Sequence, residues 1–140
     1  AGEIELQYES FIQPVAPLNA VLDSSAQPMS DPLACHKTTA RDHLTCVKDR
    51  HPMYEEVLMQ TENGHLVGFL KGNVVIELQG SKLTPELGNH FLAGTYARYL
   101  AEIDEVNFAP LTVQDLHSAT KIWRINSVTR WVEINLNRGN

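Results

Sequence analysis

Two histidines and a cysteine lie close together in the sequence and are the first residues that could do chemistry. Positions three or four apart share one face of a helix, so His43, Cys46 and His51 could together bind a metal ion. The alternative is a small buried cysteine flanked by solvent-facing histidines, and it explains these residues better. We therefore expect no metal site.

The composition is that of one ordinary globular domain. The 140 residues are 43% hydrophobic and 20% charged, with a formal net charge of -6. A chain of this size buries roughly two thirds of its unfolded surface, enough for a single core. No block of like charge is present, so we expect neither nucleic acid nor a membrane surface as partner, and the expected ligand is a small molecule.

The N-terminus and the cysteines suggest the cellular compartment. The first five residues lack the basic and apolar regions of a signal peptide, and no apolar run approaches the ~20 residues that span a bilayer. Cys35 and Cys46 are too few for a disulfide scaffold and match no zinc spacing. We expect a cytoplasmic protein with reduced thiols.

The N-terminal part has a different character from the rest. Residues 3–7 alternate in polarity, as a short strand does, and residues 14–32 contain four prolines among Asp, Ser and Met. This composition predicts that residues 1–30 are the end of a preceding domain, a strand followed by a Pro/Ser-rich linker. Residues 31–140 are then a separate domain, and we expect the chain to be the end of something larger.

Strand and helix patterns alternate after the predicted linker. Thr38 or Thr39 can cap a helix that ends near Arg50, and Thr112 can cap a short helix with Asp115 in its first turn. The other predicted elements are a helix over 93–103 and strands over 54–60, 66–70, 74–78, 107–111, 121–125 and 130–136. Strands interrupted by three helices predict an α+β domain around a curled mixed sheet.

A series of short motifs follows in a fixed order after residue 31. They are His36-Lys37-Thr38-Thr39-Ala40-Arg41, 55–59 with 62–66, 74–85, 92–96, 111–116, and Asn126-Ser127-Val128. Each motif is weak alone. In this order and at this spacing they resemble the class IV aminotransferases, the fold-type IV pyridoxal-phosphate enzymes, and particularly the aminodeoxychorismate lyase branch.

The resemblance implies a fold and an assembly. The chain would be the lysine-bearing, large C-terminal domain of the D-amino-acid aminotransferase-like fold, with a curled, barrel-like mixed sheet and about three helices. The family forms homodimers and builds its site between two domains. The N-terminal domain, which contributes a phosphate-binding arginine and part of the substrate pocket, is expected to lie outside these 140 residues.

The resemblance also implies the residues that would hold pyridoxal phosphate. Lys37 would be the catalytic lysine, because a primary amine can hold the cofactor's aldehyde and then move the substrate's α-proton. Anions bind at helix N-termini, which suits Gly94, Thr95 and Tyr96 for the phosphate, with a further hydrogen bond from Ser127. The remaining candidates are Arg41, Asn73 and Asn126 for the cofactor, and Val128 and Thr129 for the substrate pocket.

One departure from the family concerns the pyridine nitrogen, which the family keeps protonated with a glutamate. Aligning Asn73 with the family's asparagine places Gly68 at that glutamate's position, and the small residues that follow become Phe69-Leu70-Lys71. Glu62 lies in a turn and Glu77 lies further along the next strand, so neither substitutes in register. Without a carboxylate the nitrogen is mostly unprotonated near neutrality, which weakens catalysis.

Two further departures concern arginines. The family commonly has an arginine directly after the glycine turn, whereas this chain has Ala97 followed by Arg98. One residue turns a side chain by roughly 100° on a helix, so Arg98 need not reach the same place. Thr129 and Arg130 stand where the family has small residues around the substrate carboxylate, and their bulk and charge could close that pocket.

Two functions are consistent with these residues. The first is a pyridoxal-phosphate-dependent lyase that eliminates pyruvate from aminodeoxychorismate to give p-aminobenzoate in the folate pathway, or a related class IV aminotransferase. The second is a catalytically degenerate family member, or a domain fragment, that serves as a binding or assembly module. Lys37, Thr95, Asn126 and Ser127 favour the first, and Gly68 with the absent domain favours the second, so enzymatic activity stays open.

Overall fold

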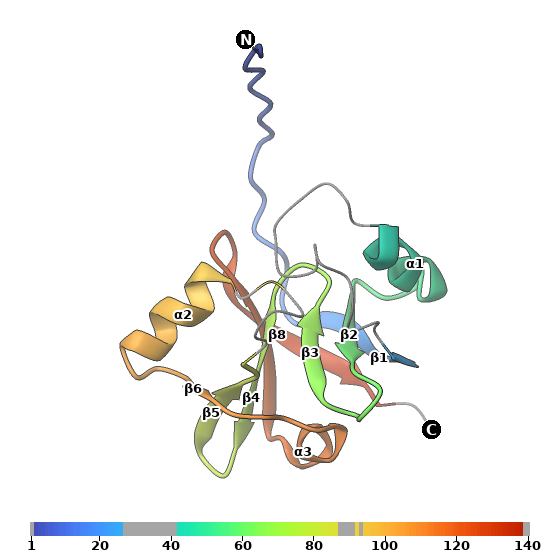
Figure 1. The fold of residues 1–140 in the computed structure, drawn as a ribbon, viewed down its shortest axis with the longest axis vertical. Coiled ribbons are helices and arrows are strands. Elements are labelled where there is room, and N and C mark those ends of the chain that lie inside the picture. The colour runs from blue at the N-terminus through green and yellow to red at the C-terminus, as the bar shows by residue number, and fades with distance from the viewer. Residues whose placement is uncertain (1, 27–41, 87–91, 93, 139–140) are drawn as a thin grey trace.

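The computed structural model describes residues 2–26, 42–86, 92 and 94–138, which form eight strands and three helices (Figure 1). None of these helices is long and apolar enough to span a membrane. In chain order the elements are β1 (Leu18–Ala26), α1 (Asp42–Arg50), β2 (Glu56–Gln60), β3 (Leu66–Phe69), β4 (Asn73–Leu78), β5 (Ser81–Thr84), α2 (Thr95–Glu102), β6 (Asn107–Phe108), α3 (Val113–Ser118), β7 (Lys121–Asn126) and β8 (Arg130–Asn137).

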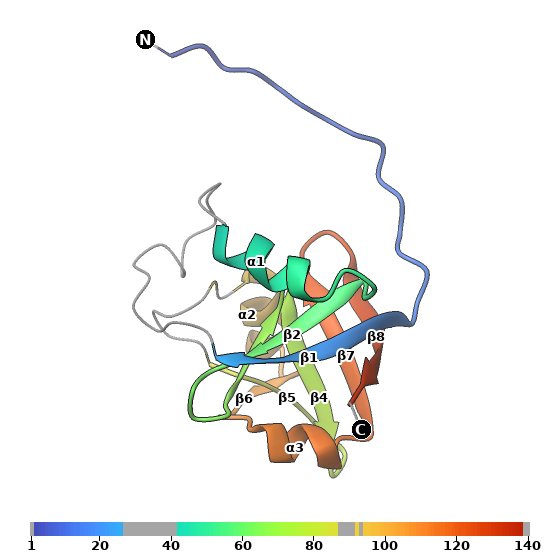
Figure 2. The ribbon, with the colours of Figure 1, turned by 90° about the vertical axis from the view of Figure 1, so that its right-hand side faces the viewer.

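The strands form one curled mixed sheet in the order β3-β2-β1-β8-β7-β4-β5-β6. Strand β1 is parallel to both of its neighbours, whereas β7 is antiparallel to both β4 and β8. The sheet curls into a half-barrel, with α1 and α2 over its outer side and α3 at one end (Figures 1 and 2). The predicted α+β class, curled sheet and three helices are confirmed.

The linker prediction is wrong for β1. Residues 18–26 form a central strand that pairs with β2 through Ala20–Leu22 and with β8 through Leu18–Val21. Leu18 and Ala20 are buried. Asp and Ser have low strand propensity, but pairing on both sides supplies the backbone hydrogen bonds and the packing that decide strand formation. Pro14 and Pro17 precede the strand and do not interrupt its backbone hydrogen bonds.

The prediction of a strand at residues 3–7 is also wrong. Residues 2–15 have no regular structure, and they run away from the sheet (Figure 2). Alternating polarity does not make a strand when no neighbour supplies hydrogen bonds. The other predicted strands are present within one or two residues, except that 107–111 is a strand only over Asn107–Phe108. Strand β5, within the motif at 74–85, is an additional strand.

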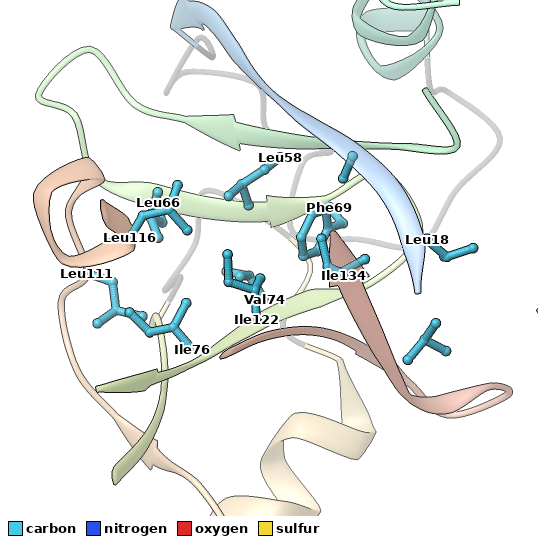
Figure 3. Close-up of a cluster of buried hydrophobic side chains, with 12 residues drawn as sticks. Leu18, Leu58, Leu66, Phe69, Val74, Ile76, Leu111, Leu116, Ile122 and Ile134 are labelled. Carbon is cyan, nitrogen blue, oxygen red and sulfur yellow. The ribbon is translucent and has the colours of Figure 1, made fainter. Parts of the chain in front are cut away.

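The main hydrophobic core fills the concave side of the half-barrel (Figure 3). Leu58, Val74, Ile76 and Ile122 point into it from strands far apart in the sequence, and Leu116 closes it from α3. Each such side chain stabilises the fold by about 1.5–3 kcal/mol when fully buried. This core holds β2, β4 and β7 at fixed positions.

Two smaller clusters attach the other helices to the convex side. Val47 of α1 packs with Val57 of β2, and Ala97 and Leu100 of α2 pack with Ile125 of β7. Side chains alternate along a strand, so β7 presents Trp123 and Ile125 to the cluster with α2 and Ile122 to the main core. The position of α2 relative to the end of β7 is therefore fixed by packing.

The predicted helix ends are mostly confirmed. Helix α1 ends at Arg50, α2 lies within the predicted 93–103, and α3 begins with the capping box in which Thr112 and Asp115 bond reciprocally. The predicted cap at residues 38–39 lies outside the described residues.

The interpretation of Cys46 as a buried residue is wrong. Cys46 is exposed, and its neighbour Val47 takes the buried position of α1. His51 does not simply face solvent either, because its Nε2 lies 3.0 Å from Oδ1 of Asp23. In the described residues no group of three or more His, Cys, Asp or Glu side chains could hold a metal ion.

Asp23 joins β1 to the end of α1. Its buried carboxylate accepts hydrogen bonds from Arg50 Nη2 at 2.5 Å and pairs with His51 at 3.0 Å. Its backbone oxygen accepts a bond from Gln60 of β2 at 2.8 Å. Burial alone would raise the pKa of Asp23, but the hydrogen bonds from Arg50 and His51 outweigh it and hold the pKa below its ordinary value.

Asp23→Asn should therefore lower stability near neutral pH and have less effect in acid. The folded-state pKa is depressed, so the stabilisation is complete above the unfolded pKa of about 3.9 and is lost as pH falls through the folded value. We expect the free energy of unfolding, measured by urea denaturation at neutral pH, to fall by about 1–3 kcal/mol. The difference between the variant and the unsubstituted chain should become smaller below about pH 4. Asp49→Asn, on the exposed face of α1, is the control, and an equal effect of both variants would contradict the prediction.

Candidate cofactor-binding site

The N-terminus of α2 is open and faces the end of β7. Its cap residue, Gly94, is extended (φ -62°, ψ 144°) and supplies no side-chain cap. The first N–H groups of a helix have no intrahelical acceptor, so they remain available to an anion. Asn73 fixes this end of the helix, because its Oδ1 accepts a bond from the Gly94 N–H at 3.3 Å and its Nδ2 donates to the oxygen of Leu92 at 3.4 Å.

Glycine is required at position 94. A Cβ there would lie 2.5 Å from Oδ1 of Asn73, closer than real contacts allow. Any side chain would thus push the start of α2 away from Asn73. The sequence predicted both residues for the cofactor site, and the structure brings them together.

Two exposed hydroxyl groups lie side by side next to this helix end. Thr95 Oγ1, in the first turn of α2, and Ser127 Oγ, just after β7, are 2.9 Å apart. Both were predicted as phosphate-binding residues, and the fold brings them together from positions 32 residues apart. Tyr96, predicted with them, follows Thr95, and its ring stacks on Tyr99 at a centroid distance of 6.2 Å.

Asn126 shapes the turn that carries Ser127. Its Oδ1 accepts bonds from the N–H groups of Val128 and Thr129, at 3.0 and 2.7 Å, and from the Thr129 hydroxyl at 3.0 Å. Its Nδ2 donates to the oxygen of Lys71 at 2.8 Å. All these bonds are internal, so Asn126 acts here as a positioning residue. Val128, predicted for the substrate pocket, is exposed on the same turn.

Lys37 and Arg41 lie outside the described residues. Their predicted roles as the catalytic lysine and a cofactor-binding residue are therefore untested by this geometry.

Gly68 supplies no carboxylate to the site, and its surroundings are crowded. It lies near the end of β3, before a tight turn in which the Phe69 N–H donates to the oxygen of Gly72 at 2.9 Å. A Cβ at Gly68 would lie 3.2 Å from the same Gly72 oxygen. Glu77 is occupied elsewhere, because its Oε1 accepts a bond from Thr120 at 2.9 Å.

A fully buried carboxylate, Glu56, lies behind this turn. Its Oε1 accepts bonds from the N–H groups of Val57 and Leu70, at 3.1 and 2.8 Å. Its Oε2 accepts bonds from the Lys71 N–H at 3.2 Å and from Arg124 Nη1 at 3.0 Å. Each carboxylate oxygen of Glu56 already accepts two hydrogen bonds. Glu56 therefore has no free acceptor with which to take the role of the glutamate that is missing at position 68.

Glu56 and Arg124 were not among the residues predicted from the sequence. The available signal was a charged residue inside an apolar strand, since Glu56 precedes Val57-Leu58-Met59 and Arg124 lies between Trp123 and Ile125. Charged residues are almost never fully buried unless they are paired. Two such residues in one domain predict a buried ion pair.

Comparison with known proteins decides the family. The profile described as amino-transferase class IV matches residues 5–136. The chain belongs to the class IV aminotransferase family. No protein of curated function matches the sequence.

Solved structures share the fold. A protein from Mesorhizobium loti, designated an amino-acid aminotransferase, is 24% identical with a TM-score of 0.78, over 86% of this chain and 59% of its own. A Legionella pneumophila protein designated a 4-amino-4-deoxychorismate lyase is 13% identical with a TM-score of 0.79, over 90% and 50%. A Mycobacterium tuberculosis aminotransferase in its PLP-bound form is 21% identical with a TM-score of 0.72, over 86% and 48%. The chain thus spans about half the length of these relatives.

One position beside the candidate site carries backbone strain. Arg130 pairs with Asn126 across the β7–β8 hairpin and has a φ of 59°, the left-handed region that favours glycine. A non-glycine residue costs roughly 1–2 kcal/mol in this conformation. The side chain lines a cavity of about 470 Å³ together with Tyr96, Ser127 and Trp131.

Glu56→Gln should strongly destabilise the fold. The substitution leaves Arg124 buried without a carboxylate, and the NH₂ group of the new amide cannot accept a hydrogen bond. We therefore expect the free energy of unfolding, measured by urea denaturation, to fall by about 3 kcal/mol. Glu62→Gln, in an exposed turn, should change stability by less than about 0.5 kcal/mol. A cost for Glu56→Gln no larger than that of the control would show that the buried pair is not important for stability.

Arg130→Gly should stabilise the fold. Glycine removes the left-handed strain but adds chain entropy in the unfolded state, for a net gain of about 0.5–1 kcal/mol. For a domain of this size we expect the melting temperature to rise by roughly 2–4 °C in thermal denaturation. A lower melting temperature would show that contacts of the arginine side chain outweigh the strain.

Proposed function

We propose that this chain binds pyridoxal phosphate as the lysine-bearing half of a class IV enzyme. The observation that carries the proposal is the pair of exposed hydroxyls, Thr95 and Ser127, 2.9 Å apart beside a helix N-terminus that Gly94 keeps open. Lys37 would hold the cofactor's aldehyde.

The donor set suits the phosphate end of the cofactor. Helix N–H groups and the positive end of the helix dipole favour an anion, and two hydroxyls can each donate a further bond. Asn73 positions Gly94, and Asn126 positions the turn with Ser127. When bound, pyridoxal phosphate withdraws electrons from the substrate's α-carbon and so eases loss of its proton. The Lys37 amine would accept that proton and return it.

The reaction that we propose is the lyase reaction on aminodeoxychorismate, which yields pyruvate and p-aminobenzoate. Amino-group transfer on the same scaffold is the nearest alternative, since it uses the same lysine. Membership of the class IV family supports both. As part of the same proposal, the protein acts as a homodimer in the cytoplasm, in the folate pathway, on a small amino-acid-like substrate.

A second candidate function rests on Gly68. Without a carboxylate at this position the pyridine nitrogen loses the partner that keeps it protonated, and Glu56 is already occupied. A protein of this kind would retain the fold and cofactor binding with little turnover. It would serve as a binding or assembly module.

The proposal predicts how two hydroxyl deletions change cofactor affinity. Thr95→Val and Ser127→Ala each remove one donor to the phosphate, and a hydrogen bond to a charged group is worth about 1.5–3 kcal/mol. Each variant should therefore raise the Kd for pyridoxal phosphate at least roughly tenfold, measured by absorbance titration of the purified chain. Ser118→Ala, an exposed serine at the end of α3, should leave the Kd unchanged.

Covalent trapping then separates the two candidate functions. The chain is saturated with pyridoxal phosphate, reduced with borohydride and mapped by mass spectrometry. No adduct at Lys37 would contradict the proposal. An adduct together with pyruvate release from aminodeoxychorismate, abolished in Lys37→Ala, supports the lyase. An adduct without turnover on amino acids or aminodeoxychorismate supports the binding module.

A further inference from the structure

The carboxylate of Asp23 connects the two elements that flank Lys37 in the chain. Asp23 lies on β1, three residues before the end of that strand, and its partners Arg50 and His51 lie at the end of α1 and directly after it. In the sequence, Lys37 lies between these elements, eleven residues after the last residue of β1 and five before the first residue of α1. The contact at Asp23 therefore ties together both sides of the Lys37 stretch.

Helix α1 has little apolar contact with the sheet that it covers (Figure 2). Only Val47 among its residues is buried, where it packs with Val57 of β2, and Leu44 is partly buried in the same cluster. One buried side chain near the middle of a helix does not by itself fix the direction of the helix axis. The ion pair of Arg50 provides a second attachment, to β1, at the end of the helix.

The contact at Asp23 is a strong one. The residue is only 1% exposed, Arg50 Nη2 donates to Oδ2 at 2.5 Å, and His51 Nε2 lies 3.0 Å from Oδ1. Hydrogen bonds between charged groups are roughly twice as strong as those between neutral groups. The bond from Gln60 of β2 goes to the backbone oxygen of Asp23, at 2.8 Å. A substitution of the Asp23 side chain thus releases the end of α1 and leaves this bond between β1 and β2 in place.

We propose that Asp23 is a positioning residue for Lys37, an inference that rests on the proposed function. By holding the end of α1 against β1, Asp23 fixes the elements on both sides of the Lys37 stretch and so limits the positions that the amine can take. Two groups on one molecule react according to their effective concentration, which falls when the connection between them becomes looser. Asp23 acts through α1 and need not contact the cofactor.

The test separates non-covalent binding of the cofactor from its reaction with Lys37. Pyridoxine phosphate has no aldehyde, so its Kd reports non-covalent binding alone. With pyridoxal phosphate, the Lys37 nitrogen bonds to the aldehyde carbon, the aldehyde oxygen leaves as water, and borohydride traps the product. In Asp23→Asn, the concentration of pyridoxal phosphate that gives half-maximal adduct should rise roughly tenfold, the effect of one charge-assisted contact. The Kd for pyridoxine phosphate should change less than about twofold.

Two control variants distinguish a role in positioning from a general loss of structure. Gln60→Met removes the bond to the backbone oxygen of Asp23 and weakens the link between β1 and β2 without altering the end of α1. Asp49→Asn removes a carboxylate from the exposed face of α1. Neither variant should shift the half-maximal concentration for adduct formation.

A second variant tests the same contact from the side of α1. Arg50→Gln should reproduce the rise seen in Asp23→Asn, and Arg50→Lys should recover part of the loss, because an ammonium group can still pair with the carboxylate. The side chain of Arg50 is 42% exposed, so these variants disturb the core less than a change at the buried Asp23. They keep the proposal testable if Asp23→Asn does not fold.

Each other outcome overturns a defined part. If Asp23→Asn and Arg50→Gln form the adduct as readily as the unsubstituted chain, the positioning role is refuted while the proposed function stands. The same holds if Gln60→Met causes an equal shift, or if the affinity for pyridoxine phosphate falls as much as adduct formation. If the unsubstituted chain forms no adduct at Lys37, the proposed function is refuted and this inference with it.

Discussion

The carboxylate of Glu56 has no contact with solvent and accepts four hydrogen bonds, three from backbone N–H groups and one from Arg124. A buried charge is costly unless it is paired and hydrogen-bonded, and the Glu56 carboxylate has a donor at each of its four acceptor positions. It connects β2 to β7 across the half-barrel and fixes the turn between β3 and β4. Gly68 precedes that turn and Asn73 follows it, and Asn73 in turn holds Gly94. The start of α2 is therefore positioned by a charge on the other side of the sheet.

The two ends of the cofactor site depend on different kinds of group. The phosphate end is built from backbone N–H groups, a glycine and two short hydroxyl side chains, Thr95 and Ser127. These persist as long as the fold persists, because the helix itself supplies most of the donors. In the proposed site, the ring end would depend on one carboxylate, and position 68 provides only a glycine. The proposed phosphate end does not depend on that position, so the two ends could be altered independently.

The sequence predicted the family, the fold class and most elements correctly. Hydrophobic periodicity and the order of the motifs can be read directly from the residues of β2 to β8. Strand β1 was not predicted, because its Asp and Ser residues have low strand propensity. The strand is stabilised by pairing with β2 and β8, which the sequence pattern does not show. The contact between Glu56 and Arg124 was not predicted either, because the pairing of residues 68 positions apart is a tertiary property. Thr95 and Ser127 were found through motif resemblance, whereas their contact and the cavity beside Arg130 required the folded chain.

The tight turn after Gly68 leaves little room for a side chain at this position. A side chain at position 68 would place its Cβ 3.2 Å from the oxygen of Gly72, and Gly72 is itself confined, because a Cβ there would lie 2.5 Å from the oxygen of Ile125. A glutamate introduced at position 68 by one substitution would therefore require the backbone of this turn to shift. Because Gly72 is confined on its other side, the turn has little room to make that shift, and the sheet around Gly68 itself resists a side chain there.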